Sequence, residues 1–140
     1  MANVILVGVD GSETSRKAAR VAAELAASTG ATLHVLSAFD KANVETVTEG
    51  YDTWVVTSAD GAEATAARVA EELKEIAPNV ESSPLYGKPA DALVEEAKRL
   101  QARLIVVGNK RMQGVSRVLG SVANSVSHNA PCDVYIVKTV

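Results

Sequence analysis

The sequence is poor in several residue types, and each shortage argues against a class of protein. It has one cysteine, Cys132, so an internal disulfide cannot form, and a cytoplasmic location is the simplest expectation. Aromatic residues make up 4% of the chain, too few for a surface on which single-stranded nucleic acid stacks. The formal net charge is -3, so no basic field favours nucleic acid or an anionic membrane as a partner.

Apolar residues are plentiful, at 47% of the chain, but they form no long run. No segment approaches the roughly 20 consecutive apolar residues that a membrane span requires. The opening segment, MANVILVGVDGS, has neither a basic stretch nor a cleavage site, so we expect no signal peptide. A chain of 140 residues fits one domain with one hydrophobic core, and we expect residues 1–140 to form it.

Apolar segments alternate along the chain with segments of helical periodicity. The expected strands are residues 4–9, 31–39, 80–85, 103–108 and 134–138. The first and fourth are apolar at nearly every position, which is typical of strands covered on both faces. The third is short and polar and contains Pro84, as strands at a sheet edge do. The alternation predicts an α/β fold with a parallel sheet and right-handed crossovers.

The helices between these strands carry recognisable start and stop signals. Ser12 is suited to the N-cap of the first helix, and Gly30 is suited to close it. A second helix is expected from about 59 to 77, a third from Pro89, and a last one from near Val118.

The segment from Asp40 to Ser58 has little periodicity and contains the one tryptophan, Trp54. Connections of this length are often functional. Whether this segment covers a ligand or packs on the domain stays open.

Two of the expected strand ends carry residues suited to an anionic ligand. In open parallel sheets, ligands bind beyond the carboxyl ends of the strands, where the strand order reverses. One such end is Val9-Asp10-Gly11-Ser12. The other is the segment 108–121, which runs from Gly108 to a Gly-Ser pair at a helix entrance. Free N–H groups and the helix dipole attract anions there, and Lys110, Arg111 and Arg117 add positive charge.

Each of these residues also has a purely structural explanation. Glycines after strands are common turn residues, and Gly120-Ser121 is also an ordinary helix start. Asp10 is suited to share a helix cap with Ser12. His34, in an apolar strand, is expected to be a hydrogen-bonded core residue rather than a ligand. Neither G-x-x-x-x-G-K-[ST] nor G-x-G-x-x-G occurs, and no metal-ligand or Ser-His-Asp pattern is legible.

Four blocks along the chain resemble the universal stress proteins, members of the adenine-nucleotide alpha-hydrolase-like superfamily. They are VILVGVDGSETSRKAA, TLHVLSAF, GKPADALVEEAKRLQARLIVVGN and VLGSVANSVSHNAPCDVYIVKT. The resemblance covers essentially the full length, and the last block is the most specific. It implies a Rossmann-like α/β fold, with an open five-stranded parallel sheet of order 3-2-1-4-5 and helices on both faces. It also implies a homodimer in which the C-terminal strand, Asp133 to Thr139, pairs with its twin.

The resemblance further implies a site for ATP or a related adenine nucleotide between the first and fourth strands. Nucleotide-binding members carry a glycine, two residues, a glycine, about nine residues, and then glycine with Ser or Thr. By position, the first glycine is Gly108 and the closing pair is Gly120-Ser121, while Asp10 meets the ribose or an Mg²⁺-bound phosphate and Val35 lies beside the adenine. The implied set is Val9, Asp10, Gly11, Ser12, Val35, Val107, Gly108, Arg111, Gly114, Gly120, Ser121 and Val122.

The chain departs from the family pattern at the second glycine, where Arg111 stands, and its loop is one residue shorter than the commonest form. Gly114 offers another flexible point. Arg111 either binds phosphate itself, as a forked and permanently charged donor, or fills the phosphate space. Two functions therefore stay open: a stress-response regulator that binds ATP or cyclic AMP, and a nucleotide-independent dimeric adaptor. Enzymatic activity is expected to be at most a slow ATPase, because Asp10 is the one candidate base near the phosphates.

Overall fold

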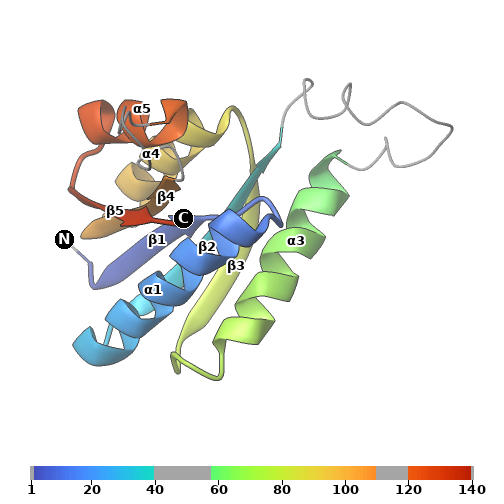
Figure 1. The fold of residues 1–140 in the computed structure, drawn as a ribbon, viewed down its shortest axis with the longest axis vertical. Helices are drawn as coiled ribbons and strands as arrows, with labels where there is room; N and C mark the ends of the chain where they lie inside the picture. The colour runs from blue at the N-terminus through green and yellow to red at the C-terminus, as the bar shows by residue number, and fades with distance from the viewer. Residues whose placement is uncertain (1, 40–57, 110–119, 140) are drawn as a thin grey trace, which may run out of the picture.

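A computed structural model of the chain describes residues 2–39, 58–109 and 120–139, where strands and helices alternate (Figure 1). The strands are β1 (Val4–Gly8), β2 (Thr32–Phe39), β3 (Val80–Tyr86), β4 (Leu104–Asn109) and β5 (Asp133–Lys138). The helices are α1 (Glu13–Thr29), α3 (Ser58–Leu73), α4 (Pro89–Leu100) and α5 (Ser121–Asn129). The strands form a five-stranded parallel sheet of order β3-β2-β1-β4-β5, so the predicted fold and strand order are confirmed.

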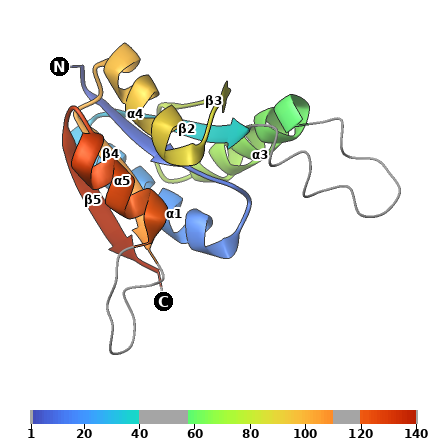
Figure 2. The same cartoon turned by 90° about the horizontal axis from the view of Figure 1, so that it is seen from above.

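Each face of the sheet is covered by a different pair of helices, α1 with α3 and α4 with α5 (Figures 1 and 2). Side chains of a strand alternate between the two faces, so each strand contributes to two cores. In β1, Ile5 and Val7 join the core under α1 and α3, while Leu6 joins the core under α4 and α5. Both faces of the central strand β1 are covered, which is consistent with its apolar residues at every position.

The signals predicted for α1 are confirmed at both ends. The Ser12 hydroxyl accepts a hydrogen bond from the Ser15 N–H, and Gly30 takes a left-handed conformation with φ of 71°. The face toward the sheet consists of small residues, namely Ala18, Ala19, Ala22, Ala23 and Ala26. These small side chains let α1 lie close to the strands beneath it.

Some element boundaries differ from the prediction. The helix predicted to end at Ala77 ends at Leu73, because the N–H groups of Ile76 and Ala77 both donate to the Leu73 carbonyl and tighten the chain into a turn. The last helix begins at Ser121 rather than near Val118, because Gly120 has extended backbone and acts as its N-cap. The edge position predicted for the strand with Pro84 is confirmed, since β3 ends the sheet.

No helix among the described residues combines the length and the apolar character that crossing a membrane requires.

Candidate functional site

A cavity of about 290 Å³ opens at the carboxyl ends of β1, β2 and β4. Its position follows from the topology, because β2 lies on one side of β1 and β4 on the other, and the crossovers leave in opposite directions. Several of the predicted site residues line this cavity together, namely Val9, Asp10, Ser12, Val107, Gly108 and Val122. The two strand ends singled out in the sequence therefore meet at one crevice.

A tight turn after β1 holds Asp10 in a fixed orientation. Gly11 has φ of +88°, a left-handed conformation that side chains disfavour, and it lets the chain turn from the strand into α1. The Ser12 N–H donates to Asp10 Oδ1 at 2.9 Å, and the Asp10 N–H donates to Ser15 Oγ at 3.2 Å. Asp10 thus has the structural role beside Ser12 that its position predicts, and it also lines the cavity.

The same contacts set the charge of Asp10. Burial alone raises the pKa of its carboxyl group, but hydrogen bonds from the Ser12 hydroxyl and N–H and from Ser15 outweigh burial, so the pKa lies below its usual range. Asp10 is therefore a carboxylate at neutral pH. Such a group accepts a hydrogen bond from a ribose hydroxyl or binds a cation, and it repels an uncompensated phosphate.

The opposite wall of the cavity is apolar and comes from three elements. Leu36 and Ala38 of β2, Leu93 of α4, and Val107 of β4 face the space. Val35 lies elsewhere, because alternate strand residues point to opposite faces and its side chain is fully buried under α1 and α3. The β2 residues at the cavity are therefore Leu36 and Ala38. Because β2 is buried along most of its length, its sequence does not indicate which residues reach the cavity.

Position 108 requires a glycine for a reason other than the turn expected from the sequence. The left-handed glycines among the described residues are Gly11, Gly30 and Gly87, so Gly108 is not needed for a sharp turn. A Cβ built on Gly108 would lie 3.1 Å from Thr139 Cγ2, 3.3 Å from Ala18 Cβ and 3.4 Å from the carbonyl oxygen of Thr14. The missing side chain lets α1 and the C-terminal residues approach β4.

The start of α5 is fixed by a contact that sequence reasoning missed. The side-chain Oδ1 of Asn109 accepts a hydrogen bond from the Gly120 N–H at 2.8 Å. Ser121 is exposed at the first position of the helix, and the N–H groups of the first turn have no partner within the helix. Val122 of this turn reaches the cavity lining, so the positive end of the helix dipole lies beside it.

Several predicted residues lie outside the described residues, so the structure says nothing of them. They are Arg111 and Gly114, the neighbouring Lys110 and Arg117, and the segment 40–57 with Trp54. Conversely, the sequence did not single out Gly8, Leu36, Ala38, Leu93, Thr14 and Ser15, which also line the cavity. Of these, Gly8 had a usable signal, because a glycine inside an apolar strand often marks a close approach.

His34 is a hydrogen-bonded core residue, as predicted. Its Nε2 lies 2.8 Å from Ser83 Oγ, and the residue is 6% exposed. The carboxylates of Glu81 and Glu96 each lie 3.6 Å from a ring nitrogen. Within residues 2–39, 58–109 and 120–139, no group of three or more His, Cys, Asp and Glu side chains is arranged to hold a metal ion.

Comparison with known proteins agrees with this arrangement. Residues 1–138 match the model of the universal stress protein family. Universal stress protein Rv1636 of Mycobacterium tuberculosis is 35% identical over 145 residues, covering 96% of this chain and 95% of that protein.

Two solved structures are informative. A crystal structure of a universal stress protein in complex with cAMP is 30% identical, has a TM-score of 0.77, and covers 98% of this chain and 97% of its own. The universal stress protein of Archaeoglobus fulgidus in complex with dAMP is 24% identical, with a TM-score of 0.70 and 96% of both chains covered. The latter likeness concerns the fold alone. The chain belongs to the universal stress protein family.

Proposed function

We propose that this chain is a stress-response regulator that binds an adenine nucleotide in the crevice between β1 and β4. The observation that carries the proposal is the cavity at the reversal of strand order, which combines an apolar wall, an oriented carboxylate and the N-terminus of a helix. The solved relative in complex with cAMP, which is 30% identical over nearly the whole chain, supports an adenine nucleotide as the ligand.

The three features suit the three parts of a nucleotide. The apolar side chains of Leu36, Ala38 and Leu93 offer a surface to the base. Asp10, ionised and oriented by Ser12, accepts a hydrogen bond from a ribose hydroxyl. The first turn of α5 offers unpaired N–H groups to phosphate oxygens. A volume of about 290 Å³ is at the low end of the range for small-molecule sites, as expected for a compact ligand.

The charge balance of the cavity bears on which nucleotide binds. Among the described lining residues the ionisable side chain is Asp10, and none is lysine or arginine. Positive charge to balance a triphosphate must therefore come from the segment 110–119, with Lys110, Arg111 and Arg117, or from Mg²⁺ held with the help of Asp10. A nucleotide with one phosphate, such as cyclic AMP or AMP, needs less of this charge than ATP does.

We expect binding rather than rapid turnover at this site. Hydrolysis of ATP requires a base near the attacking water, and the best catalytic bases have a pKa near the working pH. The pKa of Asp10 is lowered by its hydrogen bonds, which makes this carboxylate a weak base. Any hydrolysis that depends on Asp10 is expected to be slow.

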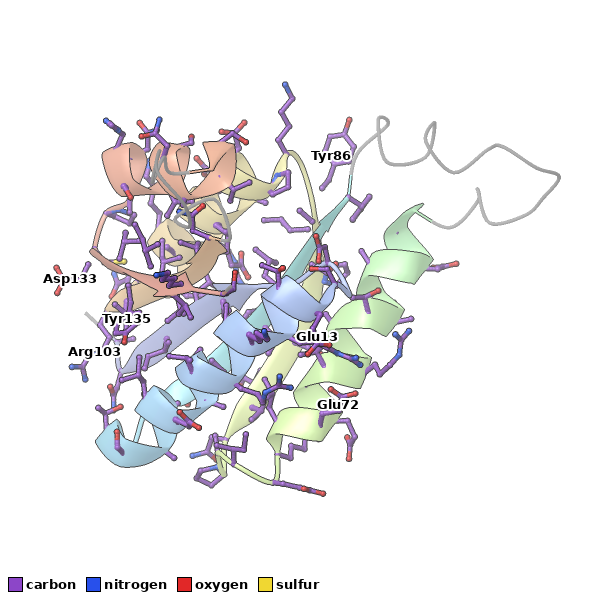
Figure 3. The ribbon with its side chains drawn as sticks, in the orientation of Figure 1. Glu13, Glu72, Tyr86, Arg103, Asp133 and Tyr135 are labelled. Atoms are coloured by element: carbon purple, nitrogen blue, oxygen red, sulfur yellow. The ribbon has the colours of Figure 1, made fainter. Side chains whose placement is uncertain are left out.

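A homodimer through residues 133–139 is part of the proposal. β5 ends the sheet, so one side of its backbone has no strand partner within the described chain. Tyr135 on this strand is 46% exposed and offers an aromatic surface at this edge. Figure 3 shows Asp133 and Tyr135 at the β5 end of the molecule and Tyr86 at the β3 end. This free edge also favours the second candidate function, a dimeric adaptor that needs no nucleotide.

Calorimetric titration of nucleotide-stripped protein tests the proposal. The ligands are cyclic AMP, AMP, ADP and ATP, each with and without Mg²⁺, and the variants are Asp10→Ala and Arg111→Gly. We expect saturable binding that Asp10→Ala weakens by roughly ten- to hundredfold, since a hydrogen bond to a charged group contributes about 1.5–3 kcal/mol. Failure of wild-type protein to bind any of these nucleotides, with binding restored by Arg111→Gly, would overturn the regulator and favour the adaptor.

A further inference from the structure

Asn109, the last residue of β4, connects two parts of the crevice. Its Oδ1 accepts a hydrogen bond from the Gly120 N–H at 2.8 Å, and the residue is 3% exposed. Gly120 is the N-cap of α5, and these two residues flank the segment 110–119. The bond therefore determines where α5 begins relative to the end of β4.

The chemistry of this contact fixes the orientation of the amide. A backbone N–H only donates, so the side-chain atom that faces it must be the oxygen rather than the nitrogen. The amide nitrogen, Nδ2, therefore points elsewhere. It is buried and has no hydrogen-bond partner among residues 2–39, 58–109 and 120–139. Native proteins seldom leave a buried amide donor unpaired, and each case calls for an explanation.

The surroundings of Asn109 supply that explanation. Its neighbour Gly108 lines the cavity, and so does Val122 in the first turn of the helix that Asn109 holds. Asn109 therefore joins a cavity-lining residue of β4 to the helix turn that carries Val122, next to the proposed phosphate position. A neutral amide suits this place, because one planar group offers an acceptor to the helix N–H and a donor to a phosphate oxygen.

We propose that Asn109 is a phosphate-binding residue, with Oδ1 positioning the start of α5 and Nδ2 donating a hydrogen bond to a phosphate oxygen of the bound nucleotide. The proposal rests on the proposed adenine-nucleotide function and assigns a role within that site. It explains why this buried donor has no partner among the described residues. It also explains why the carboxamide, rather than an isosteric carboxylate, occupies this position.

The decisive variant is Asn109→Asp, titrated calorimetrically with AMP, cyclic AMP and adenosine. Aspartate keeps an acceptor for the Gly120 N–H, but it replaces the donor with a negatively charged oxygen that repels phosphate. We expect AMP to bind at least tenfold more weakly, cyclic AMP to weaken by a smaller factor because it carries less charge, and adenosine to bind as it does to the wild type. The control is Asn124→Asp, which places the same charge at an exposed position of α5 and should change AMP affinity less than threefold.

The adenosine titration separates a role at the phosphate from a loss of structure. Unchanged AMP affinity in Asn109→Asp overturns the proposal, and so does a parallel loss of adenosine and AMP binding, which indicates a merely structural residue. If Asn109→Asp does not fold, Asn109→Ala replaces it, with the same selective loss of AMP over adenosine expected. A wild-type protein that binds none of the three probes refutes the proposed function itself, whereas equal AMP binding by wild type and variant refutes only the role of Asn109.

Discussion

The packing around Gly108 leads to a prediction that compares two glycines in adjacent strands. Adding a methyl group at Gly108 places the new Cβ 3.1 Å from Thr139 Cγ2, 3.3 Å from Ala18 Cβ and 3.4 Å from the Thr14 carbonyl oxygen. Ala18 Cβ and the Thr14 carbonyl oxygen belong to α1 and cannot shift without moving the helix, and the Thr139 side chain is buried and β-branched. The corresponding Cβ at Gly8 meets Leu93, at 3.2 and 3.3 Å from its terminal methyl groups, and these can rotate away.

The expected change in the free energy of unfolding is the balance of two opposing effects. Overpacking a well-filled site costs typically 1–3 kcal/mol, and replacing a strand glycine by alanine returns about 0.5–1 kcal/mol because the unfolded chain loses freedom. Gly108→Ala should therefore lower the free energy of unfolding by about 1–2 kcal/mol. Gly8→Ala should change it by less than about 1 kcal/mol, because a rotamer change of Leu93 relieves most of the clash.

Urea denaturation followed by circular dichroism measures both values. The expected result is a lower midpoint for Gly108→Ala at an unchanged slope, with Gly8→Ala close to wild type. A Gly108→Ala protein as stable as the wild type, or a Gly8→Ala protein that is the less stable of the two, would refute the explanation that close approach of α1 requires a glycine at 108.

Three further predictions follow from other contacts. Ser12→Ala removes the N-cap of α1 and should lower the free energy of unfolding by about 1 kcal/mol in urea denaturation, with no loss if the cap is dispensable. Two hydrogen bonds from Arg99 to Glu96, at 2.9 and 2.7 Å, lower the pKa of the Glu96 carboxyl despite its burial, with a smaller contribution from His34, so the folded state favours the ionised form. Glu96→Gln should therefore lower the free energy of unfolding by about 1–2 kcal/mol above pH 5. This loss of stability should shrink as the pH falls below the pKa of the unfolded state, about 4.5, and through the lower pKa of the folded state. A loss of stability that does not depend on pH in unfolding titrations contradicts this prediction. Tyr135→Asp should shift the protein from dimer to monomer in sedimentation velocity, and Tyr86→Asp, the exposed tyrosine at the opposite edge, should not; equal behaviour of the two variants counts against the β5 interface.

The fold was predictable because its signals are local and agree with one another. Uniformly apolar strands indicate a sheet covered on both faces, Ser12 and Gly30 mark the ends of α1, and Pro84 marks an edge strand. The end of α3 was predicted too late because Ala77 is still buried after the helix has ended, so the apolar periodicity outlasts the hydrogen bonds. The spacing of apolar residues reflects which side chains are buried, and side chains beyond the end of a helix can be buried as well.

Only part of the candidate site was predictable from the sequence, because some of its residues come together from distant parts of the chain. Asp10 follows β1, and Gly108 lies near the end of β4. These two strands neighbour each other, and the rule for open parallel sheets brings such ends together. Asn109 was missed because its bond to Gly120 crosses a segment with no periodic pattern. Leu36 was missed because a strand buried on both faces does not show which residues reach a cavity at its end.

Amide chemical-shift mapping of ¹⁵N-labelled, nucleotide-stripped protein during titration with AMP shows whether an adenine nucleotide binds between β1 and β4. We expect the largest shifts in Asp10, Gly108 and the first turn of α5, with smaller ones at Leu36 and Ala38. A second groove, between α1 and α3 beside Arg16 and Glu72, should be unaffected. Shifts confined to that groove, or no shifts at millimolar AMP, would contradict the account.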